Sequence, residues 1–182
     1  MQEQLAGDIG TLQDKQQALE RELETKQEAL ASLDEEKNVV DNQLRTAKNS
    51  AARLPSLNIC QKALASALSD SASAEDFRGM DRRGLMELTG GDAVAADILE
   101  SLQGLDDAGV LTEEKQLVVD IENAMYLSEP LEELQAQSDA LATRIEDDAA
   151  NIKVTENELE EVNRELEAYE VCAHVGAVAK AL

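Results

Sequence analysis

The sequence predicts an all-α protein, a long intramolecular antiparallel coiled-coil hairpin with a small helical domain inserted at the tip. Apolar residues recur at alternating spacings of three and four near both ends of the 182-residue chain, which is typical of a coiled coil. The composition is rich in Ala, Leu, Glu, Gln and Asp, with no Trp and a single Phe, and this suits long helices. Two prolines, Pro55 and Pro130, separate a middle segment from the two repeating ends.

Residues 1–54 form the predicted first arm of the hairpin. Its repeat is interrupted by the polar residues Gln16, Lys26 and Lys37. We expect the helix to end just before Pro55, because the residue preceding a proline avoids helical dihedral angles. The apolar positions of this arm are Leu5, Ile9, Leu12, Leu19, Leu23, Leu30, Leu33, Val40, Leu44 and Leu54.

Residues 55–127 are too long for a turn and are predicted to form the small helical domain at the tip. Residues 69–74 are small and polar, which predicts a loop, and Gly104 and Gly109 predict the end of the third helix and a turn. Such short helices can bury a modest core. The expected helices are Ser56 to Leu68; one capped by Asp81 with Leu85, Met86 and Leu88; one capped by Asp92 with Val94, Ile98, Leu99 and Leu102; and one capped by Thr112 with Leu117, Val118, Ile121 and Met125.

Residues 128–182 form the predicted returning arm. Ser128 is the expected N-cap, Pro130 lies in the first turn, and Glu129, Glu132 and Glu133 lie near the positive end of the helix dipole. A single helix that starts near Glu113 and kinks at Pro130 is the alternative. The apolar positions of this arm are Leu131, Leu134, Leu141, Ile145, Ile152, Leu159, Val162 and Leu166.

If the chain folds so that Leu54 meets Leu131, two residues of the arms face each other when their numbers sum to 185. This alignment places Lys37 opposite Asp148, the charged residues least suited to an apolar seam. If the helices slipped by one heptad, Lys37 and Asp148 would each face an uncharged residue. A buried charge without a partner is costly. We therefore expect this pair to specify the alignment and to add little net stability. The alternative is that both side chains extend separately to water.

A second apolar stripe lies beside the first near the end of the returning arm. It consists of Val171, Val175, Val178 and Leu182. A helix that is apolar on more than one face usually has more than one neighbour. This stripe predicts self-association of the chain into a homo-oligomer, or attachment to another protein.

The chain is strongly acidic, with 39 Asp and Glu against 16 Lys and Arg and a net charge of −23. Such a field repels phosphate backbones, so direct nucleic-acid binding is not expected. Solubility is the first interpretation of the acidity, and a basic partner surface is the second. No apolar run reaches transmembrane length, so no membrane association is expected. Cys60 and Cys172 would lie roughly 70 Å apart along the hairpin, and reduced thiols predict a cytoplasmic protein.

Catalytic, metal-binding and cofactor-binding patterns are absent from the sequence. With one His and two distant Cys, no zinc set can be assembled, and no nucleophile–base–acid group is recognisable. The segment Thr89-Gly90-Gly91-Asp92 lacks the Lys and following hydroxyl of a phosphate-binding loop. The carboxylate clusters of the returning arm are interpreted as solvated helix faces. We therefore expect a protein that is not an enzyme and carries no cofactor.

The tip contains the only basic cluster, formed by Phe77, Arg78, Met80, Arg82 and Arg83. Local salt bridges to neighbouring carboxylates are the simpler interpretation. A docking surface for an acidic partner is the alternative, and this cluster is the candidate partner surface of the tip.

These features predict a structural or interaction protein, in which a rigid hairpin of about 75 Å holds a helical domain for protein contacts or assembly. The alternative is a fragment of a larger machine. An arm whose two ends emerge together and which carries a domain at its far end resembles the arms of SMC- and Rad50-type ATPases, which would imply a role in chromosome maintenance. The chain departs from that pattern, because it has neither a Cys-x-x-Cys hook nor an ATPase motif.

Overall fold

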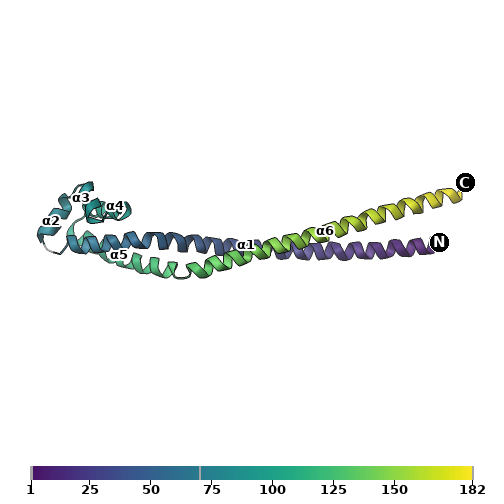
Figure 1. Ribbon diagram of the computed structural model, residues 1–182, viewed down its shortest axis with the longest axis horizontal. Helices are drawn as coiled ribbons and strands as arrows, with labels where there is room; N and C mark the ends of the chain where they lie inside the picture. Colours follow the sequence, from purple (N-terminus) through teal and green to yellow (C-terminus); the bar gives the residue numbers. More distant parts are fainter. Residues whose placement is uncertain (1, 70, 182) are drawn as a thin grey trace. The chain divides into compact units, whose positions relative to one another are not determined.

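The structure, a computed structural model, describes the backbone of residues 2–69 and 71–181 and the side chains of residues 6–69 and 73–172. Within these backbone ranges the chain forms six helices and no strand, which confirms the all-α class (Figure 1). The helices are α1 (Gln2–Ala67), α2 (Ser71–Gly79), α3 (Arg82–Leu88), α4 (Ala93–Leu102), α5 (Asp107–Ser128) and α6 (Leu131–Ala181).

The helices divide into two compact units. The first contains residues 1–40 and 137–182, and the second contains residues 41–136. Helix α1 contributes to both units, because its first part belongs to one and its second part to the other. The second unit also includes the start of α6 together with α2, α3, α4 and α5.

Helix α1 continues through Pro55, and the prediction that it ends there is wrong. The proline has no N–H to donate, which costs about 3 kcal/mol in a helix interior. Its ring is exposed, however, while Ala47, Leu57 and Cys60 are buried on the other face. Burying large apolar side chains contributes roughly 1.5–3 kcal/mol each, so packing on both sides of the proline outweighs its local cost.

In the first unit, α1 and α6 run antiparallel. Gln16 Nε2 donates to Asn163 Oδ1 at 2.9 Å, and Lys26 Nζ donates to Thr155 Oγ1 at 2.8 Å. Residue numbers therefore rise along α1 as they fall along α6. An apolar cluster lies beside these bonds and consists of buried Leu19, Val162 and Leu166 with Ile9, Leu12 and Leu159 packed against it.

The two hydrogen bonds join residues whose numbers sum to 179 and 181, rather than to the expected 185. These two bonds lie nearer to a second alignment, in which the numbers of facing residues sum to 178. This alignment differs from the expected one by a shift of one heptad. A shift of one whole heptad keeps apolar positions opposite apolar positions, so the sequence pattern alone separates the two alignments weakly. Lys37 and Asp148 are both half-buried on the inner faces of their helices. Their mutual pairing stays a prediction.

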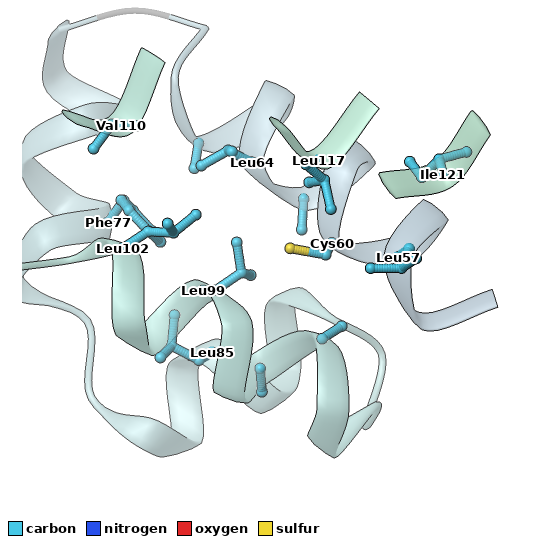
Figure 2. Packing of buried hydrophobic residues seen from close by; sticks show 14 of the residues in the cluster. Leu57, Cys60, Leu64, Phe77, Leu85, Leu99, Leu102, Val110, Leu117 and Ile121 are labelled. Carbon is cyan, nitrogen blue, oxygen red and sulfur yellow. The ribbon is translucent and has the colours of Figure 1, made fainter. Parts of the chain in front are cut away.

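The second unit has its own apolar core, to which α1, α2, α3, α4 and α5 contribute (Figure 2). Burial, with a smaller contribution from the nearby Asp92 carboxylate, raises the pKa of the Cys60 thiol to about 11, so this thiol is protonated and unreactive at neutral pH. The largest buried side chains of the unit are Leu57, Leu64, Phe77, Leu85, Leu99, Leu102, Val110, Leu117 and Ile121.

Two helix starts in this unit agree with the prediction. The Asp81 side chain accepts from Gly84 N at the start of α3, and the Asp92 side chain accepts from Ala95 N at the start of α4. Between these helices Gly90 and Gly91 adopt φ angles of 64° and 92°, which residues with a Cβ rarely adopt. The glycine pair therefore makes the tight turn that brings Asp92 to its capping position.

The start positions of two other helices differ from the prediction. Residues 71–74, expected in a loop, begin α2. Helix α5 begins at Asp107, because Asp106 accepts from Gly109 N and caps it, whereas Thr112 lies inside the helix and donates to Ala108 O. Gly109 is consequently helical and does not form the expected turn.

The expected N-cap at Ser128 is also wrong. Ser128 is the last residue of α5 and donates to Met125 O at 3.0 Å, and α6 begins at Leu131. Leu134 N donates to Pro130 O, so Pro130 immediately precedes the helix. The chain is thus helical on both sides of a break at residues 129–130, which is closer to the alternative of a helix interrupted at Pro130.

We predict that the Asp92 cap makes stability depend on pH. The backbone N–H of Ala95 and the Ser56 hydroxyl, which donates to Asp92 Oδ2 at 2.8 Å, hold the pKa of this carboxyl below its usual range. A depressed pKa in the folded state stabilises the fold above the pKa of the unfolded chain, and this contribution is lost as pH falls through the folded pKa. Asp92→Ala should therefore destabilise the protein at pH 7 and have a smaller effect at pH 3.

Urea unfolding of both proteins at the two pH values, followed by circular dichroism, measures this difference. Asp92→Asn is the matched control, because its amide oxygen still caps α4 without carrying a charge. An equal loss of stability in Asp92→Ala at both pH values would contradict the prediction.

Candidate functional site

Helix α5 has an exposed apolar face in addition to its buried one. Leu111, Val118 and Met125 recur every seven residues and so share one side of the helix, and Met125 is 56 % exposed. Val119 and Tyr126 follow this stripe by one position, and Tyr126 is 74 % exposed. We call these five residues the α5 apolar face. Val118 and Met125 were expected to pack with Leu117 and Ile121 in the core of this unit, and their exposure shows that this expectation is wrong.

The buried side of α5 explains this difference. Val110, Leu117, Ile121 and Ala124 occupy the core of the second unit. Leu117 and Val118 are adjacent and point in directions about 100° apart, and Leu117 is the one that lies on the side of α5 that faces the core. The heptad spacing of Leu111, Val118 and Met125 was the sequence signal that could have identified a second face.

An open groove of about 950 Å³ lies in the second unit, between α1 and the junction of α5 and α6. Its apolar lining comes from Tyr126, Leu127, Pro130 and Leu134. We call it the junction groove. Its polar lining comes from Asn42, Gln43, Thr46, Glu129, Glu132 and Glu133.

The charge at the junction groove is negative. Glu129, Glu132 and Glu133 contribute three carboxylates, and the last two lie in the first turn of α6, where the helix dipole favours anions. The guanidinium of Arg45 lies at the rim, where it donates to Asn42 Oδ1 at 3.0 Å. Across residues 41–136 there are 18 acidic and 8 basic side chains, a net charge of −10.

Packing of α1 holds one wall of the junction groove in place, and one hydrogen bond joins α1 to α6 beside it. Lys48 Nζ on α1 donates to Gln135 Oε1 on α6 at 2.8 Å, next to Leu134 of the lining. Leu44 and Ala47, which flank the groove residues of α1, are buried. The backbone that carries Asn42, Gln43 and Thr46 is thus held by packing while these three side chains remain exposed.

The basic cluster of the tip, the candidate partner surface, does not form one exposed surface. Phe77 is 1 % exposed and belongs to the core, so it cannot contact a partner. The half-buried Met80 packs against that core, and Gln103 Nε2 donates to its backbone oxygen and to that of Phe77.

The three arginines of this cluster pair with local carboxylates. Arg78 pairs with Asp107, and Arg83 Nε lies 3.2 Å from Glu87 Oε1. Arg82 joins α3 to α4 through Asp97 and Glu100, and hydrogen bonds to these carboxylates raise the pKa of its guanidinium. The structure therefore favours the local salt bridges over a docking surface for an acidic partner.

The predicted self-association stripe is described only at its first residue. Val171 is 63 % exposed on α6. The side chains of Val175 and Val178 and the whole of Leu182 lie outside the described residues. Self-association through this stripe stays a prediction.

Among the described side chains, no three His, Cys, Asp or Glu residues lie close enough together to hold a metal ion. Within the described helices, none combines the length and the apolar character needed to cross a bilayer. The α5 apolar face and the junction groove are the candidate functional surfaces of the described residues.

Comparison with known proteins gives no family for this chain. No protein-family model matches it, and neither does a curated protein or a solved structure.

Proposed function

We propose that the chain is a non-enzymatic structural and interaction protein. An antiparallel coiled coil of α1 and α6 acts as its spacer, and the helical unit of residues 41–136 supplies the surface that contacts another protein. The observation that carries this proposal is the α5 apolar face, with Met125 and Tyr126 more than half exposed.

The spacer role is supported by the packing of the first unit. Leu19, Leu33, Val40, Ile152 and Val162 are buried at heptad-related positions along two antiparallel helices. Packing of this kind produces a stiff rod with little surface left for small-molecule binding. A rod of paired helices suits a protein that spaces or presents other groups.

The contact role is supported by the composition of the exposed surface. Large apolar side chains that cluster on the exposed side of a helix often mark an interaction site. Tyr and Met are enriched at protein interfaces, where they contribute large contact areas. The α5 apolar face and the junction groove share Tyr126, and the exposed Lys115 and Glu122 lie among the apolar residues of this face. Together they offer a partner a surface that is both apolar and charged.

A photo-crosslinking amino acid placed at Met125 of the full-length chain tests the contact role. We expect irradiation in cells of the native source to give a discrete adduct with another protein, identified by mass spectrometry. The same amino acid at Val154, which is 55 % exposed on α6, is the control and should not give this adduct. The same adducts at both positions, or none at either, would contradict the proposed function.

Disulfide trapping tests the alignment of the coiled coil. We propose the alignment with a sum of 178, because the Gln16–Asn163 and Lys26–Thr155 bonds lie nearest to it. In a chain whose Cys60 and Cys172 are replaced by Ala, Leu33→Cys with Ile145→Cys should then oxidise faster than Leu33→Cys with Ile152→Cys. Facing positions meet the geometry of a disulfide, whereas positions one heptad apart are about 10 Å out of reach.

The reverse order of rates would contradict this alignment. It would instead support the sum of 185, in which Lys37 lies opposite Asp148. Non-reducing electrophoresis after brief oxidation distinguishes the two results, since a trapped hairpin migrates differently from the open chain.

A further inference from the structure

We infer that the junction groove binds a basic segment of a partner protein. The segment would place an apolar side chain against Tyr126, Leu127 and Leu134 and a Lys or Arg side chain near Glu129 and Glu132. This inference rests on the proposed function and names the chemistry of the partner.

The shape and lining of the groove favour a side chain with both apolar and cationic parts. Its volume of about 950 Å³ exceeds what one side chain needs and lies within the usual range of ligand-binding pockets. Tyr126 presents an exposed aromatic ring on which an aliphatic stem or a guanidinium can pack. Lys and Arg carry apolar stems that end in a charge, so one such residue can satisfy the apolar lining and the carboxylates together.

The negative charge of the groove favours a positively charged partner. Glu129 and Glu132 are both exposed and lie within one turn of each other across the start of α6. The guanidinium of Arg45 at the rim offsets only part of this charge. The net charge of −10 on residues 41–136 adds a longer-range attraction for cations, which speeds the encounter with a basic partner.

The same charges disfavour two other occupants. A second copy of the chain carries a net charge of −23, so it would bring like charge to the groove. A nucleic acid would bring phosphates of the same sign. A basic protein segment is therefore the occupant that agrees with both the lining and the charge.

Fluorescence anisotropy with a labelled probe peptide tests this inference. The probe is an 18-residue amphipathic helix of Leu and Lys, and a Leu and Glu peptide of the same pattern is the negative control. Full-length protein should bind the first and not the second. The variant Tyr126→Ala/Glu129→Gln/Glu132→Gln should bind the Lys peptide at least about tenfold more weakly, because it loses an aromatic anchor and two charges.

The matched control variant is Val154→Ala/Glu156→Gln/Glu158→Gln. It makes the same change in net charge at exposed positions of α6 outside the second unit. We expect its affinity to stay within about twofold of the original. All substituted side chains in both variants are exposed, and thermal unfolding by circular dichroism verifies that each variant is folded.

Three results would overturn the inference. Equal weakening in both triple variants would mean that the peptide responds to net charge alone. No binding of the Lys peptide would exclude a basic occupant, and a dimer in sedimentation equilibrium that Tyr126→Ala dissociates would assign the groove to a second copy. A protein adduct at Met125 combined with any of these results would leave the proposed function standing and remove only this inference.

Discussion

The buried stripe of α1 is the constraint on which the other features depend. In the first unit it buries Leu19 and Leu33, and in the second it buries Leu57, Cys60 and Leu64. One helix therefore contributes to two apolar cores. Pro55 is tolerated because it lies on the exposed side of this helix, where its ring displaces no core residue. A break at this position would separate Leu57 and Cys60 from the packing that precedes them.

The packing of α5 against this stripe also determines which surface is available for partners. Leu117, Ile121 and Ala124 enter the core with Leu57 and Cys60. The remaining apolar residues of α5 are then left on the outside of the helix. The junction groove forms where α5 ends and α6 begins beside α1, so its apolar lining and its carboxylates come from segments that the same packing brings together.

The sequence predicted those features that depend on local chemistry. The helical class followed from the heptad repeat, and Asp81 and Asp92 were identified as caps because a carboxylate that accepts from the N–H three residues later is a local interaction. Prediction from the sequence failed where the burial of side chains outweighs the preference of single residues for helix ends. Pro55 is a typical helix end in isolation, yet α1 passes through it. Ser128 was expected to cap the start of a helix, but it is the last residue of α5.

The candidate site was less predictable, because it depends on which of two apolar faces is buried. The residues of the basic cluster were recognised, but Phe77 lies in the core and each arginine has a carboxylate partner. The junction groove combines α1 with residues at least 80 positions away, and no local pattern specifies such a contact. The heptad alignment of α1 with α6 is ambiguous for a related reason, since a shift of seven residues preserves the pattern.

The continuity of α1 through Pro55 is tested most directly by nuclear magnetic resonance of the full-length chain. Carbon-13 Cα chemical shifts of residues 48–62 report helical geometry one residue at a time, and amide exchange reports the hydrogen bonds on either side of the proline. The account predicts helical shifts on both sides of Pro55 and slow exchange for the buried turn that contains Leu57 and Cys60. Random-coil shifts at residues 52–57 with fast exchange through Cys60 would contradict it, because α1 would then be two helices with separate cores.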